Sequence, residues 1–134
     1  MANLENIEGV GKTYAGKLAK AGVTTTNGLL KLGATRKGRS VLAAASGCTE
    51  KQILEWVNRA DLFRIKGVGE EYSDLLEVAG VDSVPELAQR NANNLHEKMA
   101  EVNAAKRLVR QMPSSSVVSA WVAQAKTLPK VVTH

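Results

Sequence analysis

Two segments of this chain are copies of one another, and this internal repeat constrains the fold more than any other feature. Residues 7–31 and 65–89 align without gaps, and ten of the 25 aligned positions are identical, including both Gly-Val-Gly triplets. Self-similarity at a fixed spacing indicates that one structural unit is formed twice. We therefore predict two small units, residues 1–61 and residues 62–134.

The spacing of apolar residues predicts that both units are helical. In 12–21 the apolar side chains recur every three or four residues, and 70–79 repeats the same phase. Alternating β-branched runs are scarce apart from the tail at 131–133. Helices are predicted at 12–21, 36–46, 49–61, 70–79 and 94–111, with others that start at Thr25, at Ser83 and at a serine within 114–116. The predicted fold is all-α, with two tandem units of five helices each, packed into one compact body.

Glycines and tryptophans mark the expected ends and core of these helices. Gly22, Gly47 and Gly80 stand where a helix ends in a left-handed residue. Trp56 and Trp121 occupy matching positions within apolar helices. We therefore expect both indoles in the core rather than stacked on nucleic-acid bases.

The net charge of +5 is carried by the first half of the chain. Residues 1–60 contain nine Lys/Arg and four Asp/Glu, whereas residues 61–134 contain nine of each. A basic half beside a neutral half favours a face that binds a polyanion, and an ordinary solvated surface is the plain alternative. No apolar run has the length of a membrane span, and a single cysteine fits a reducing compartment. We expect a cytoplasmic protein with no membrane partner.

The pattern around the first Gly-Val-Gly triplet resembles a known motif. Ile7, Gly9, Gly11 and Leu18 follow the spacing of the helix-hairpin-helix motif of DNA repair and replication proteins. Over about residues 3–128 the chain resembles an uncharacterised bacterial family of tandem helix-hairpin-helix proteins, a domain-of-unknown-function family. Its units are similar to the double helix-hairpin-helix domains of DNA repair proteins. The resemblance implies that the turn carbonyls can hold a monovalent cation, and we expect no other cofactor and no metal.

The first hairpin turn has the chemistry of a phosphate site. Its glycines let the backbone turn sharply, and free amides at the start of the next helix attract an anion. We expect Gly9, Gly11 and Lys12 to form the primary site, and Thr49 and Lys51 a second one. Such contacts hold DNA without reading its sequence. The full set of predicted DNA-phosphate-binding residues is Gly9, Val10, Gly11, Lys12, Thr13, Lys17, Lys20, Arg36, Lys37, Arg39, Thr49 and Lys51.

The two copies differ where the helix after the turn begins. Lys12 and Thr13 follow the first triplet, whereas Glu70 and Glu71 follow the second. Carboxylates complement the positive end of a helix dipole, and lysines there cost about a few tenths of a kcal/mol each. We interpret the first copy as the part that binds duplex or branched DNA, and the second as its structural mate.

The sequence leaves a rival function open and makes enzymatic chemistry the weakest interpretation. The rival is a protein-interaction module in which the hairpins are purely structural, with a protein partner bound through the near-neutral second unit. Residues 6–13 imitate a P-loop but lack its first glycine, and His96 has no second ligand at metal spacing. Cys48 is expected to be a buried apolar residue of a hairpin rather than a reactive thiol. No catalytic residue is predicted.

Overall fold

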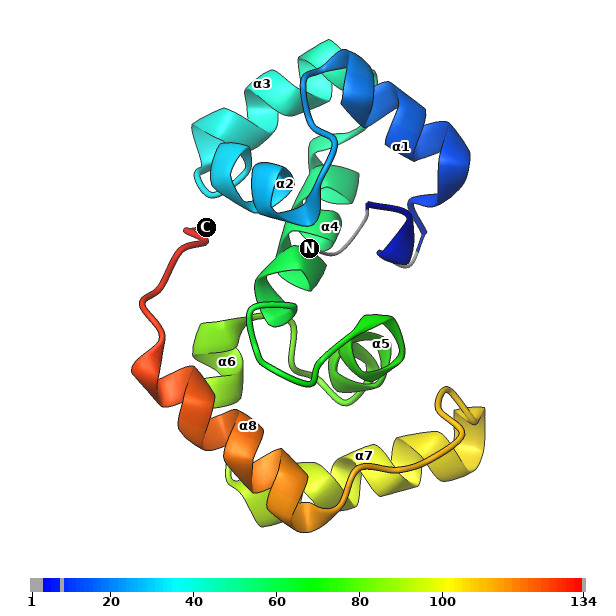
Figure 1. Cartoon of the computed structure of the whole chain (residues 1–134), viewed down its shortest axis with the longest axis vertical. Helices are drawn as coiled ribbons and strands as arrows, with labels where there is room; N and C mark the ends of the chain where they lie inside the picture. The colour runs from blue at the N-terminus through cyan, green and yellow to red at the C-terminus, as the bar shows by residue number, and fades with distance from the viewer. Residues whose placement is uncertain (1–3, 8, 134) are drawn as a thin grey trace. The chain divides into compact units, whose positions relative to one another are not determined.

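The computed structural model describes residues 4–7 and 9–133, and all regular secondary structure in these residues is helical (Figure 1). The prediction of an all-α chain is therefore confirmed. The elements are a short 3₁₀ helix, η1 (Leu4–Asn6), followed by α1 (Gly11–Lys20), α2 (Thr26–Leu32), α3 (Arg36–Ser46), α4 (Glu50–Leu62), α5 (Glu70–Val78), α6 (Val84–Ala88), α7 (Ala92–Lys106) and α8 (Ser115–Thr127).

The chain divides into two compact units. The first is formed by Met1–Asp61 together with Val131–His134, and the second by Leu62–Lys130. The tail lies with the first unit although the repeat assigns it to the second half. Its attachment is specific, because the amide of Thr133 donates to the carbonyl of Ala34 at 2.8 Å and the side chain of Val132 is buried. The β-branched tail is thus a docked extended segment and not a strand.

Among the described residues each unit holds four α-helices, so the predicted arrangement of five helices in each unit is not confirmed. The segment before each Gly-Val-Gly triplet forms tight turns instead of a further α-helix. In the first unit the amides of Ile7 and Val10 each donate to the carbonyl three residues earlier, and Ile65 and Val68 repeat this pattern in the second. Hydrogen bonds of this spacing belong to 3₁₀ turns, which rarely extend beyond a few residues.

Most helix ends lie where the sequence predicts them. Gly22, Gly47 and Gly80 have φ values of 91°, 77° and 101°, the left-handed region in which a residue without a Cβ is favoured. The predicted caps are also present, since the side chains of Thr25, Ser83 and Ser114 each accept a hydrogen bond from a backbone amide in the first turn of the helix that follows.

The predicted helix at 94–111 is wrong at both ends. Helix α7 starts earlier and stops at Lys106, because Arg107 takes a left-handed conformation with φ 51° and ψ 50°. The side chain of Asn103 stabilises this ending by accepting a hydrogen bond from the amide of Val109 at 3.0 Å. A side-chain acceptor of this kind competes with the helical pattern that the apolar spacing favours.

Both tryptophans lie in the cores of their units, as predicted. The Trp56 ring packs on Tyr14 with centroids 5.1 Å apart, and Trp121 packs on Tyr72 at 5.3 Å, with nearly equal tilts. Each indole also lies under a hairpin turn, since a methyl group added at Gly9 would be 3.7 Å from Nε1 of Trp56. The aromatic pair therefore supports the turn in both copies.

Candidate nucleic-acid interface

The first hairpin turn leads into a helix whose amino terminus has no side-chain cap. Gly9 and Gly11 have φ values of 88° and 57°, and α1 starts at Gly11. The preceding residue, Val10, contributes no side-chain acceptor, and the first turn contains no acidic residue. The first-turn amides and the positive end of the helix dipole therefore have no compensating group within α1.

The side chain of Val10 is buried under the turn, and its amide donates to the carbonyl of Ile7 at 3.1 Å. The apolar side chain of Val10 therefore holds the turn against the core, and a phosphate contact at Val10 stays a prediction. Gly9 and Gly11 on either side of it are exposed.

The other predicted residues of α1 share one exposed face. At about 100° per residue, Lys12, Thr13, Lys17 and Lys20 fall within one side of the helix, opposite the buried Leu18. The ammonium of Lys17 lies 5.3 Å from the centroid of the Tyr14 ring, a cation–π distance. The structure thus gives α1 a lysine-bearing face directed at solvent.

A second group of basic residues surrounds a surface pocket of about 370 Å³ in the first unit. The first turns of α3 and α4 supply most of its walls, so two helix amino termini contribute their positive ends to it. Among the predicted residues, the pocket brings Arg36 and Lys51 together, although they are 15 positions apart in the sequence. The pocket is lined by Arg36, Arg39, Glu50, Lys51 and Leu54.

Arg36 and Lys51 are available to bind an anion. Both side chains are exposed, and neither forms a hydrogen bond or an ion pair with any described residue. Each stands in the first turn of a helix, where the macrodipole disfavours a cation. An anion placed between them would be attracted by both charges and both dipoles.

Arg39, another predicted phosphate contact, lines this pocket but is almost fully buried. Its side chain is only 4% exposed and its guanidinium donates to three carbonyls: Nη1 to Gly33 at 3.0 Å and Ala34 at 3.1 Å, and Nη2 to Thr133 at 2.7 Å. Burial, with a smaller effect of the neighbouring Arg36, lowers the pKa of Arg39 from its ordinary value. Arg39 therefore holds the C-terminal end of α2 and the tail in place by hydrogen bonds. Its positive charge adds to the electrostatic potential of the pocket, while its N–H donors are used within the protein.

Two further predicted residues lie outside the walls of this pocket. The hydroxyl of Thr49 accepts from the amide of Gln52 at 3.0 Å, while the Gln52 side chain accepts from the amide of Thr49. This reciprocal pair is a capping box at the start of α4. Lys37 is rotated by about 100° around α3 from Arg36, and it lies in the wall of a separate, mainly apolar pocket.

Sequence reasoning missed Glu50 and Leu54 as neighbours of the basic residues. Glu50 places one carboxylate in a pocket with three cationic residues, and its charge opposes the lowering of the Arg39 pKa. The available signal was the position of Glu50 beside Lys51 at a helix start, where a carboxylate is favoured by the dipole. Glu50 weakens the pocket for anions without cancelling its positive charge.

The equivalent helix of the second unit also starts without a side-chain cap, but its first turn is acidic. Helix α5 follows Gly69, which has an extended φ of −111° where Gly11 is left-handed, and it begins with the exposed Glu70 and Glu71. These carboxylates occupy the positions of Lys12 and Thr13 in the first unit. Their charge complements the helix dipole and repels a phosphate.

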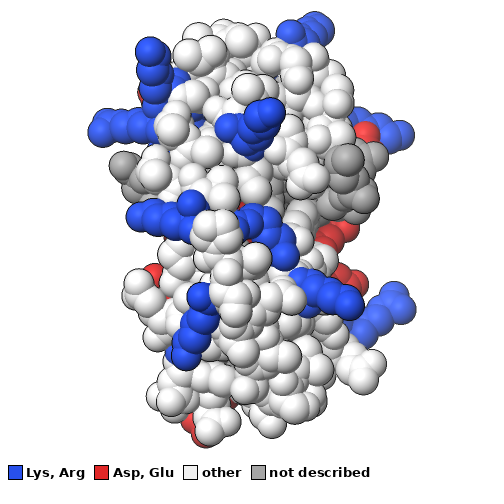
Figure 2. Space-filling model, turned by 60° about the vertical axis from the view of Figure 1, so that its left-hand side comes forward, with Lys and Arg blue, Asp and Glu red and all other residues white. Residues whose placement is uncertain are grey.

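The positive charge of the first unit is spread over its surface. In the upper part of Figure 2, Lys and Arg side chains project into solvent and are separated by uncharged surface, with few carboxylates between them. Such a distribution suits several separate contacts along a charged chain better than one compact small ligand.

The described residues provide no metal or membrane feature to add to this surface. No group of three or more His, Cys, Asp or Glu side chains among them is arranged to hold a metal ion. His96 is half-buried, with Nε2 3.0 Å from the carbonyl oxygen of Pro113, and Cys48 is buried, as predicted. No helix in the described part of the chain is long and apolar enough to cross a bilayer.

Residues 8–128 match the model of a protein family described as a domain of unknown function, DUF4332. The chain belongs to this family. The match covers most of both units and all eight α-helices of the described residues, and leaves out the 3₁₀ helix η1. No solved structure matches the chain.

Proposed function

We propose that the first unit binds the phosphate backbone of DNA without reading sequence and without catalysing a reaction. The observation that carries this proposal is the pair formed by Arg36 and Lys51. Two exposed cations stand at one pocket, at helix starts that disfavour them, with no partner among the described residues. This arrangement does not stabilise the fold, whereas it would stabilise a bound anion.

The chemistry of the two side chains suits a phosphodiester. Arg36 offers a planar fork of N–H donors for two phosphate oxygens, and Lys51 offers a compact charge beside it. Glu50 in the same pocket disfavours a very tight anion site. Lys12 and the first-turn amides of α1 would form a second phosphate contact. Several weak contacts of this kind agree with sequence-tolerant binding of duplex or branched DNA.

We also propose that each unit is a double helix-hairpin-helix. Support comes from the left-handed Gly9 and Gly67, which have φ values of 88° and 94° and lie over equivalent tryptophans. In this proposal the second unit is the structural mate, since Glu70 and Glu71 complement its helix start. A monovalent cation in the first turn would belong to the same mode of binding. The proposed site of action is the cytoplasm.

Fluorescence anisotropy with a labelled duplex tests the proposal. We expect affinity to fall steeply between low and moderate salt, with a log–log slope of roughly −0.9 for each phosphate neutralised. Lys12→Glu should weaken binding markedly. Lys98→Glu, a charge reversal on an exposed residue of the second unit, should change it little. Absence of duplex binding at low salt would refute the proposal, and parallel titrations with single-stranded and branched DNA would identify the preferred form.

A further inference from the structure

The first unit has a second pocket whose lining is mainly apolar. It has a volume of about 380 Å³ and lies among the end of α1, the end of α2 and the first half of α3. Two of its side chains, Leu32 and Val41, are 47% and 60% exposed, and they are large apolar groups with few reasons to face water. The pocket is lined by Ala21, Leu32, Thr35, Lys37, Gly38, Val41 and Leu42.

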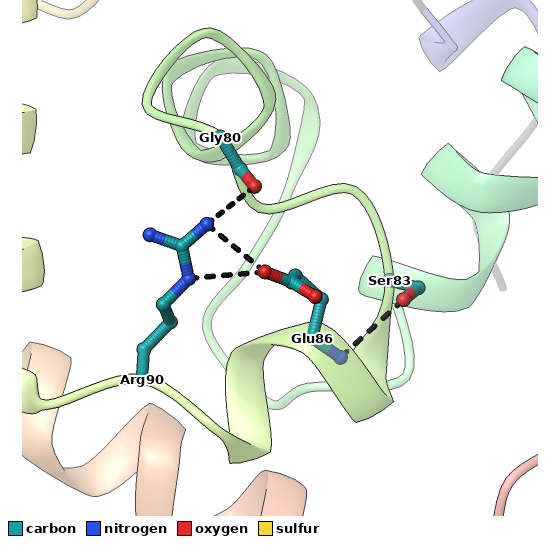
Figure 3. Close-up of polar contacts among 4 residues, drawn as sticks. All are labelled: Gly80, Ser83, Glu86 and Arg90. Carbon is teal, nitrogen blue, oxygen red and sulfur yellow. Dashed lines mark hydrogen bonds and ion pairs between the residues drawn. The ribbon is translucent and has the colours of Figure 1, made fainter.

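The second unit provides an internal comparison, because the repeat places Arg90 where the first unit has Leu32. Arg90 Nη2 donates to the carbonyl of Gly80 at 2.8 Å and pairs with Oε1 of Glu86 at 3.0 Å (Figure 3). Its Nε donates to the same carboxylate oxygen at 3.2 Å. This network covers the carbonyl at the end of α5 with polar groups.

The first unit lacks this polar network at the equivalent place. Gly28 stands at the position of Glu86, and Leu32 stands at the position of Arg90, so neither side chain can form the ion pair. The helix start is otherwise alike, since Thr25 caps α2 as Ser83 caps α6. At this equivalent place the second unit has an ion pair that covers the backbone, whereas the first unit has an open apolar surface.

The apolar pocket is separate from the basic pocket. At about 100° per residue, Arg36 and Arg39 lie on one side of α3, and Lys37 and Val41 lie on the opposite side. A DNA backbone is charged along its whole length and has no group that would fill the space beside Leu32 and Val41. The pocket thus needs a different kind of occupant.

We propose that this pocket docks an amphipathic segment of a partner protein, with an apolar side chain inserted beside Leu32 and Val41 and a carboxylate paired with Lys37. Charge complementarity supports this occupant. Lys37 is the one charged residue among the described residues that line the pocket, and the first half of the chain carries nine Lys/Arg against four Asp/Glu. A second copy docked through the same face is disfavoured, because two-fold symmetry would bring two basic surfaces together.

Selection from a phage-displayed library of random peptides against the whole chain tests the proposal. We expect enriched peptides to combine an apolar residue with neighbouring Asp or Glu. The strongest of them, added to ¹⁵N-labelled protein, should shift the amide resonances of Leu32, Lys37 and Val41. These shifts should be absent around Lys51.

The matched variant is Gly28→Glu with Leu32→Arg, which introduces the ion pair of the second unit and leaves the net charge unchanged. We expect peptide affinity to fall by about tenfold or more, the scale of losing a buried anchor. Leu32→Lys is a second variant that does not alter the α2 start. Val117→Lys, at a similarly exposed apolar residue on α8, should leave peptide binding intact. Unchanged melting temperatures would show that the variants remain folded.

Three results would overturn the proposal. One is the absence of any enriched peptide, and another is enrichment of basic peptides. The third is self-association in sedimentation experiments that Leu32→Lys removes, which would assign the pocket to a second copy. DNA affinity plays no part in these measurements, so their outcome is independent of the proposed DNA binding.

Discussion

The first glycine of each hairpin turn carries a specific and measurable energetic requirement. Gly9 and Gly67 have φ values of 88° and 94°, where an L-residue costs about 1–2 kcal/mol. A methyl group at Gly67 would also lie 3.2 Å from Nε1 of Trp121, a tight contact, whereas the corresponding distance at Gly9 is 3.7 Å. We expect Gly9→Ala to destabilise the first unit by about 1–2 kcal/mol, and Gly67→Ala to destabilise the second by more.

Tryptophan fluorescence during urea unfolding separates the two units, since each unit contains one tryptophan. Gly67→Ala is measured in a Trp56→Phe background, so that Trp121 alone reports. Gly9→Ala is measured in a Trp121→Phe background, and each is compared with its own parent.

Gly16→Ala is the matched control, because Gly16 lies inside α1 with no atom within 4 Å of an added Cβ. This change should stabilise the first unit by about 0.5–1 kcal/mol through helix propensity. If Gly67→Ala proves neutral or stabilising, the left-handed turn beneath Trp121 is not the conformation that the chain adopts.

Further predictions concern residues reassigned by the structure. Arg39→Met should destabilise the first unit by about 2–4 kcal/mol, because three hydrogen bonds to carbonyls, one of them buried and two partly buried, are lost. Arg36→Met should leave stability within about 0.5 kcal/mol. Urea unfolding of both variants checks this, and equal stabilities would show that Arg39 is not structural. Thr49→Ala should cost about 1 kcal/mol by removing the cap of α4, and Thr49→Asp should restore stability. Thermal unfolding of the two Thr49 variants measures the difference, and a Thr49→Ala protein as stable as the parent would contradict the capping role.

Periodicity and capping patterns predicted the helices well, because both are local properties. Gly47 ends α3, Thr25 and Ser83 start their helices, and the tryptophans are buried, as expected from residues within a few positions of each. The end of α7 was missed because Asn103 captures the amide of Val109 and stops the helix against its apolar pattern.

The candidate site was harder to predict, because it depends on contacts between residues that are far apart in the sequence. Arg39 and its exposed neighbour Arg36 both lie near the start of α3, and one of the three carbonyls that hold Arg39 belongs to Thr133, 94 residues away. The apolar pocket was also missed, because the exposure of Leu32 follows from the packing of three helices and from the missing partner at Gly28. The opposite charges of Lys12 and Glu70, at equivalent positions of the two helix starts, can be read from the sequence itself.

The salt dependence of duplex binding by Arg36→Gln/Lys51→Gln, beside Lys98→Gln and the unaltered chain, tests the proposed DNA binding most directly. Two lost phosphate contacts should make the log–log slope shallower by roughly 1.8, at about 0.9 per contact, and should weaken binding at low salt. Lys98→Gln should keep the slope of the unaltered chain. A double variant with an unchanged slope and unchanged affinity would contradict the assignment of this pocket to the DNA backbone.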